Sequence, residues 1–287
     1  MRLLVICATI IGAVAGEMSL SGSPCYKPKP SNYRSGRIVG GMAAIAGDAP
    51  YMVGLVKNGA VVCGASIISE NFLVLAAHCV CNNQNSIMKP TQVKAFVGMN
   101  KLSDLKSMAD NQVKYGTVSE ALISKIIVHP EYKCGKKAEN DIALLLLESP
   151  IKFSDDVQPL CLSTDDVEPG TAVVTGWGWT NEDFNLGEKP NSLQTADVPI
   201  WDNVDCQKSY KGLMKANKIS ENQICAGGRD GGLDSCWADS GGPLISKKSG
   251  NLVGIVSTGV GCARKGLPGI YTRVSRYTSW IKSYVEK

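Results

Sequence analysis

The residues with the clearest chemical potential lie in one short stretch, residues 234–243, which reads Asp-Ser-Cys-Trp-Ala-Asp-Ser-Gly-Gly-Pro. Ser240 is a candidate nucleophile, because a serine hydroxyl becomes reactive when a positioned base takes its proton. The two glycines after it allow a tight turn and the close approach of a substrate. Taken alone, this stretch also fits a simple Gly-Gly-Pro turn with an incidental serine.

Two histidines in the whole sequence, His78 and His129, are available as the base. His78 follows the apolar run 72–75, whereas His129 precedes a proline and is typical of a strand end before a turn. An imidazole also needs an acid that fixes its tautomer, and Asp141 directly precedes the apolar run 142–145. Histidine, acid and serine in this chain order form one of the known arrangements of a catalytic triad.

Six motifs surround these residues in a consistent order: Arg-Ile-Val-Gly-Gly at 37–41, Ala-Ala-His-Cys at 76–79, Asn-Asp-Ile-Ala-Leu at 140–144, Thr-Gly-Trp-Gly at 175–178, Asp-Ser-Gly-Gly-Pro at 239–243 and Pro-Gly-Ile-Tyr at 268–271. From about Arg37 to the C-terminus, the sequence therefore resembles the chymotrypsin/trypsin family of serine endopeptidases. The resemblance implies that Ser240 attacks the peptide carbonyl, His78 takes its proton and Asp141 orients His78. The backbone N–H groups of Ala238 and Ser240 are then expected to form the oxyanion hole.

The resemblance also implies cleavage after arginine or lysine. Asp234 lies at the position that forms the base of the specificity pocket, and Gly259 and Gly269 match positions that keep its walls open. A buried carboxylate needs a partner, which a substrate arginine or lysine would supply. The alternative for Asp234 is a solvated loop acid. The expected partners are proteins or peptides with Arg or Lys, and protein protease inhibitors.

The N-terminal segment predicts export and activation by cleavage. A charged start, an apolar run and small residues predict a signal peptide over residues 1–16. A membrane anchor is the alternative, but it needs about 20 apolar residues. Residues 17–37 are polar, and we interpret them as an activation propeptide rather than a flexible linker. Cleavage after Arg37 by a trypsin-like protease would create an ammonium at Ile38, which in the family pairs with Asp239 and orders the pocket. We therefore expect a secreted, extracellular zymogen.

Composition excludes several other classes of protein. The chain is 44% hydrophobic and 20% charged, so it can bury a core and is not a disordered protein. A formal charge of +4 without a basic block gives no support to nucleic-acid binding, and no later apolar segment is long enough to cross a membrane.

Eleven cysteines indicate an oxidising compartment, and ten remain once the signal peptide is removed. The resemblance implies four disulfides: Cys63–Cys79, Cys206–Cys225, Cys236–Cys262 and Cys25–Cys161. The last would keep the propeptide attached after cleavage. Cys81 and Cys134 are left over, and we expect them to pair with each other or with another chain.

Short β-rich runs between Gly, Asn and Pro residues predict an all-β protein. Two sets of six fit two six-stranded antiparallel β-barrels, as the family fold implies. We expect the peptidase domain over 38–287, with lobes at about 38–150 and 165–274 and a C-terminal helix at about 275–287 that packs on the second lobe. The strands are expected near 51–56, 61–69, 72–76, 93–98, 122–128, 142–147, 172–178, 193–200, 223–226, 243–246, 252–258 and 269–274.

Three departures from the family pattern affect the functional prediction. Ala238 replaces the usual glycine of the oxyanion hole, and if this position needs a positive φ, alanine is strained there. Thr258 replaces a flat aromatic wall, for which Trp237 compensates in part unless it merely covers neighbouring loops. Residues 99–119 lack the paired acids of the family's calcium loop, so we expect no metal and no cofactor. We predict reduced or selective activity; the alternative is a weakly active or inactive protease-like binding protein.

Overall fold

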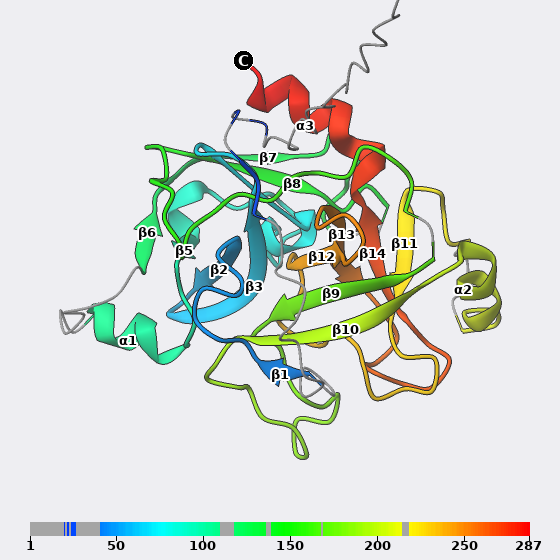
Figure 1. Cartoon of the computed structure of the whole chain (residues 1–287). Coiled ribbons are helices and arrows are strands. Elements are labelled where there is room, and N and C mark those ends of the chain that lie inside the picture. The colour runs from blue at the N-terminus through cyan, green and yellow to red at the C-terminus, as the bar shows by residue number, and fades with distance from the viewer. Residues whose placement is uncertain are drawn as a thin grey trace, which may run out of the picture.

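A computed structural model describes residues 20, 22, 24–26, 41–109, 118–135, 139–167, 169–213 and 218–287 of the chain. Two antiparallel β-structures lie side by side and account for most of the fold (Figure 1). The predicted signal peptide and the predicted cleavage site at Arg37 and Ile38 lie outside the described residues.

The first β-structure is a nearly closed barrel with the strand order β6-β5-β2-β3-β4-β8-β7. A single residue, Leu122, separates β6 from β7, so the two form one bent strand that contacts β5 at one end and β8 at the other. The strands are β2 (Met52–Lys57), β3 (Ala60–Ile67), β4 (Phe72–Leu75), β5 (Lys94–Val97), β6 (Ser119–Ala121), β7 (Ile123–Val128) and β8 (Ala143–Leu147).

The second β-structure is a closed barrel with the order β9-β12-β13-β14-β11-β10, in which β10 pairs back with β9. The strands are β9 (Thr171–Gly176), β10 (Gln194–Trp201), β11 (Gln223–Ala226), β12 (Pro243–Ser246), β13 (Leu252–Thr258) and β14 (Gly269–Arg273). A short strand, β1 (Met42–Ala43), adds to the outside of β10. The two-barrel prediction is therefore confirmed.

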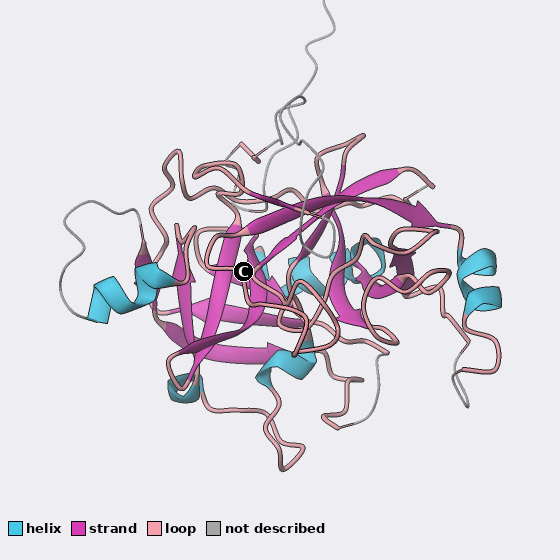
Figure 2. Cartoon of the chain, turned by 90° about the horizontal axis from the view of Figure 1, so that it is seen from below, coloured by secondary structure: helices cyan, strands magenta, loops and turns pink. Residues whose placement is uncertain are grey.

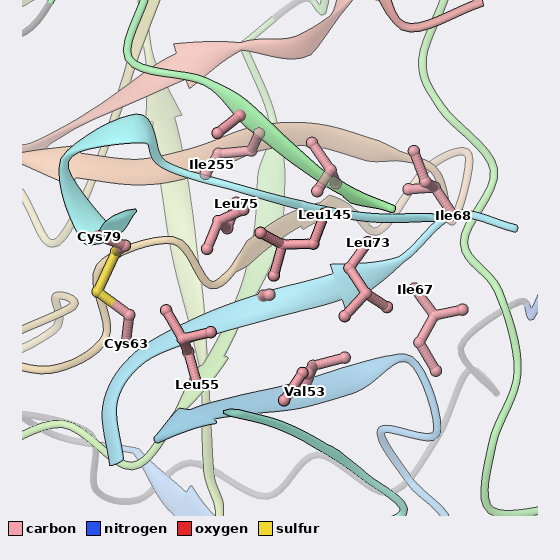
Figure 3. Close-up of a cluster of buried hydrophobic side chains, with 14 of the residues drawn as sticks. Val53, Leu55, Cys63, Ile67, Ile68, Leu73, Leu75, Cys79, Leu145 and Ile255 are labelled. Atoms are coloured by element: carbon pink, nitrogen blue, oxygen red, sulfur yellow. A yellow bond between two sulfur atoms is a disulfide. The ribbon is translucent and has the colours of Figure 1, made fainter. Parts of the chain in front are cut away.

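The core of the first barrel explains the uninterrupted apolar runs of its central strands. Phe72–Leu75 and most of Ala143–Leu147 are buried, because these strands have protein on both faces. Figure 3 shows Leu73, Leu75 and Leu145 converging with Ile255 of the second barrel. The two barrels thus share one apolar boundary, which fixes how the loops on either side of it meet.

The C-terminal helix α3 (Thr278–Val285) follows a 3-10 turn, η3 (Val274–Tyr277), and contacts the first barrel. The His129 ring lies 5.3 Å from the Tyr277 ring and 5.1 Å from the Trp280 ring, and Tyr277 Oη donates a hydrogen bond to Asn140 at 2.9 Å. Figure 1 shows α3 beside β7 and β8. The helix was predicted. Its first part, η3, contacts β13 of the second barrel as expected, but Tyr277 and Trp280 also pack against His129 of the first barrel, because an apolar stripe does not specify every surface that it covers.

Two further helices were not predicted, α1 (Ser103–Ala109) and α2 (Asn203–Ser209). Both are short, and they lie at opposite ends of the molecule in Figures 1 and 2. Asp202 caps α2, because its side chain accepts a hydrogen bond from the Val204 N–H at 2.7 Å. Within the described ranges, no helix has the length and hydropathy of a membrane span.

Candidate active site

His78 and Asp141 meet because the strands next to them are paired. His78 lies in the 3-10 turn η1 (Ala77–Val80) directly after β4, and Asp141 lies just before β8. Leu75 of β4 is paired with Ala143 of β8, so the end of one strand adjoins the start of the other. The Cys63–Cys79 disulfide holds this turn against β3, as Figure 3 shows.

Two hydrogen bonds fix the orientation of His78 relative to Asp141. Nδ1 of His78 lies 2.8 Å from Oδ2 of Asp141, and the backbone N–H of His78 donates to Oδ1 at 2.9 Å. Burial opposes a charged imidazole, yet the charge and hydrogen bond of Asp141 outweigh it and raise the pKa of His78. Burial likewise opposes a charged Asp141, but His78 and Ser257 outweigh it and lower the pKa of that carboxyl.

Ser257 is a site residue whose role sequence reasoning missed. Ser257 lies near the end of β13, and its hydroxyl donates a hydrogen bond of 2.6 Å to Oδ2 of Asp141. Its position in the motif Ser-Thr-Gly, next to the expected substrate wall, was the available signal.

Ser240 lies in the turn before β12, where glycine is required. Gly241 has φ of +79°, and an added Cβ would collide with the carbonyl oxygen of Gly64. Gly64 also donates its N–H to the Ser240 carbonyl at 2.8 Å, which ties this turn to β3. The Ser240 turn is thereby fixed against the strand that is cross-linked to the His78 turn.

Ser240 and His78 line the same pocket, which has a volume of about 340 Å³. Among the described residues, no hydrogen bond joins their side chains, and Nε2 of His78 instead lies 3.8 Å from Sγ of Cys79. The arrangement places a candidate nucleophile and an oriented base at one cavity.

Ala238 adopts φ of +75°, a left-handed conformation that favours glycine. Within the described part of the chain, neither the Ala238 N–H nor the Ser240 N–H has a hydrogen-bond acceptor. Neither N–H is therefore engaged within the described part of the protein, and alanine is strained at this position.

Asp239, between these two residues, is fully buried and points away toward the Thr-Gly-Trp-Gly segment. Its carboxylate accepts hydrogen bonds from the N–H groups of Gly178 at 2.7 Å and Cys236 at 2.9 Å. Burial raises the pKa of Asp239 to about 6, and the two backbone hydrogen bonds and the charge of Lys189 only partly oppose this rise. Among the described residues, no cation lies within ion-pair distance of the Asp239 carboxylate.

Asp234 lines the pocket that Ser240 and His78 also line, with 3% of its surface exposed. Oδ2 accepts the Ala263 N–H at 3.0 Å, whereas Oδ1 has no hydrogen-bond partner in the part of the chain that the structure describes. Burial raises the pKa of Asp234 to about 7. A Cβ at Gly269 would come within 2.8 Å of Oδ1, while one at Gly259 would have only ordinary contacts, the nearest at 3.7 Å. The pocket thus contains a buried carboxylate oxygen without a hydrogen-bond partner among the described residues, and the absence of a side chain at Gly269 leaves room beside it.

The structure joins the ten cysteines in the pairs expected above: Cys25–Cys161, Cys63–Cys79, Cys81–Cys134, Cys206–Cys225 and Cys236–Cys262. Beside Cys25, the Tyr26 N–H donates to the Pro159 carbonyl at 2.8 Å and the Tyr26 hydroxyl donates to the Asp48 carbonyl at 2.9 Å. Cys25 and Tyr26 are therefore anchored to the body of the protein.

The Cys81–Cys134 bond closes one side of a second groove. That groove is lined by His78, Thr258, Tyr132 and Asn82, among others, and adjoins the Asp234 pocket through His78, Ser257 and Thr258.

One cluster of potential metal ligands, Cys63, His78 and Cys79, occurs in the described ranges. Its two sulfur atoms are bonded to each other, so they are not thiolate ligands.

Comparisons with known proteins agree with this geometry. The family profile described as Trypsin matches residues 38–281. Trypsin-1 of Astacus astacus is 37% identical over 253 residues, which cover 86% of this chain and 99% of that relative. The chain therefore belongs to the trypsin family of serine proteases.

Proposed function

We propose that this protein is a secreted serine endopeptidase that cleaves peptide bonds after arginine or lysine and is activated by cleavage after Arg37. The observation that carries the proposal is that Ser240, His78 and Asp234 line one pocket, in which Oδ1 of Asp234 has no hydrogen-bond partner among the described residues. A cationic side chain bound to Asp234 would place the following peptide bond beside the nucleophile.

The reaction proceeds by acyl transfer to water. Ser240 Oγ attacks the carbonyl carbon while Nε2 of His78 takes its proton, and the N–H groups of Ala238 and Ser240 hold the oxyanion. His78 then donates that proton to the leaving nitrogen. Asp141 stabilises the imidazolium that forms, since its carboxylate is held by His78 and Ser257.

Specificity follows from the electrostatics of the buried Asp234 carboxyl. The carboxyl of Asp234 has a raised pKa because burial disfavours its charged form. An arginine or lysine restores a favourable environment by pairing with the carboxylate, and arginine can bind it in a bidentate manner. A phenylalanine would leave the buried carboxylate unpaired, so it is disfavoured. Substrate residues upstream of the cleaved bond lie in the groove beside Thr258.

Activation rests on the environment of Asp239. This fully buried carboxylate is held by two backbone N–H groups but has no ion-pair partner in the described residues. A new ammonium at Ile38 would supply that partner and hold the Asp239 segment, which contains both oxyanion donors. The Cys25–Cys161 bond would keep the cleaved propeptide attached.

A weakly active or inactive binding protein remains the second candidate, and the strained φ of Ala238 is the observation that favours it. A covalent organophosphonate adduct on Ser240 would separate the two functions, because it forms only if the serine is activated.

The decisive test is hydrolysis of a peptidyl-arginine chromogenic substrate before and after cleavage at Arg37. The matched controls are a peptidyl-phenylalanine substrate and a Ser240→Ala variant cleaved in the same way. We expect activity on arginine only after cleavage and only with Ser240 present. No hydrolysis by protein verified to begin at Ile38 would reject the proposal in favour of the binding function.

A further inference from the structure

Three aromatic side chains form a cluster that we call the aromatic platform: the half-buried Trp179 and the exposed Phe184 and Trp237, of which Trp237 lines the Asp234 pocket. The Trp179 and Phe184 rings are edge-on with centroids 4.8 Å apart, and the Phe184 and Trp237 centroids are 6.3 Å apart. Phe184 is 55% exposed and Trp237 is 52% exposed. Exposed aromatic groups that contact one another are uncommon on a free surface and are enriched where proteins bind other chains.

The loop that carries Phe184 is held in place by several contacts. The Trp179 N–H donates to the Trp237 carbonyl at 2.9 Å, and the Thr180 N–H donates to the Glu188 carbonyl at 3.1 Å. Glu182 accepts the Cys262 N–H at 3.1 Å and pairs with Arg264 at 2.8 Å. The platform is thus formed before a ligand arrives, which lowers the entropic cost of binding.

The position of the platform relates it to the substrate. Trp237 lines the Asp234 pocket and directly precedes Ala238, whose N–H is a proposed oxyanion donor. The groove beside Thr258 adjoins the same pocket but contains none of the three platform residues. An extended substrate anchored by its arginine therefore has two separate surfaces for its two flanks, and the upstream flank is already assigned to the groove.

We propose that the aromatic platform binds an apolar, preferably aromatic, side chain among the first three residues after the cleaved bond. This inference rests on the proposed function. The platform favours an apolar group because its three side chains are aromatic, and the nearby charges of Glu182 and Arg264 pair with each other. The exposed Leu186 lies two residues further along the same loop.

The proposal has a kinetic signature. Residues after the cleaved bond leave with the amine, so their contacts affect formation of the acyl-enzyme and not its hydrolysis. The platform should raise kcat/KM for peptides with a phenylalanine on that side. It should have no effect on an arginine anilide, which carries no residues there.

The test uses the full chain cleaved after Arg37 and a set of quenched fluorescent peptides with one common upstream sequence ending in arginine. Phenylalanine or serine is placed at the first, second or third position after the cleaved bond. We expect phenylalanine at one of these positions to raise kcat/KM about two- to tenfold, the range for one aromatic contact. Phe184→Ser should abolish this preference, and Phe184→Tyr should retain it.

The matched control is Val204→Ser, which removes another exposed apolar side chain on α2 and should leave the preference unchanged. All variants should hydrolyse the arginine anilide at the wild-type rate, which shows that they are folded. Equal cleavage of the phenylalanine and serine peptides, or a preference that survives Phe184→Ser, would overturn the platform while leaving the proposed function intact. Failure to cleave the anilide and every peptide would overturn the proposed function and this inference with it.

Discussion

The backbone of Ala238 offers the sharpest test of how this chain balances stability and catalysis. Its φ of +75° lies in the left-handed region, where an L-residue with a Cβ is strained by about 1–2 kcal/mol. Replacing it with glycine removes that strain but adds about 0.5–1 kcal/mol of chain entropy to be lost on folding. Ala238→Gly should therefore stabilise the protein by roughly 0–1.5 kcal/mol, or up to about 6 °C in Tm for a domain of this size.

The effect on catalysis should be much smaller than the loss of an oxyanion donor. Among the described residues, the Ala238 N–H has no acceptor, so alanine does not remove it from the oxyanion hole. Losing one such donor costs about 10² to 10³ in rate. Ala238→Gly should instead change kcat by less than about tenfold, through removal of a methyl group beside the reacting carbonyl.

The assay measures Tm by calorimetry and kcat on a peptidyl-arginine substrate for protein cleaved after Arg37. Ala263→Gly is the matched control for stability, because Ala263 also has a positive φ, of +55°. Its N–H donates to Asp234, so this variant is compared in Tm and not in kcat. Both variants should gain stability. A rise in kcat of a hundredfold or more in Ala238→Gly would refute the reasoning, since it would mean that alanine withdraws the donor.

Three further predictions test the pocket and the triad. Asp234→Ser should lower kcat/KM for arginine substrates by at least about 30-fold, because a buried charge pair is lost, without a similar loss for a phenylalanine substrate. Steady-state kinetics between pH 5 and 9 should show that KM for arginine substrates rises as the pH falls below about 7. Asp234 has a pKa of about 7, so its protonation in this range removes the charge that binds the cation. A KM that does not change with pH would argue against this pairing. Ser257→Ala should reduce kcat roughly tenfold by removing a hydrogen bond to the Asp141 carboxylate, worth about 1.5–3 kcal/mol in such pairs, and an unchanged kcat would show that His78 alone orients Asp141.

The amino-acid sequence by itself determined the strand pattern and the candidate chemistry. Apolar runs such as 72–75 and 142–145 predict buried strands, because an uninterrupted series of apolar side chains indicates that both faces of a strand are covered. The chemical groups are equally local, since the motif around Ser240 contains a nucleophile, two backbone donors and two carboxylates within a few residues.

The tertiary structure alone decided how distant parts meet. Three features join segments that are far apart in the chain. They are the packing of α3 on the barrels, the hydrogen bond from Ser257 to Asp141 and the contact between Phe184 and Trp237. The backbone angle of Ala238 is likewise imposed by its surroundings, because alanine left to itself avoids a positive φ. Such features depend on the closure of both barrels and on the surface they share, which no local pattern of residues encodes.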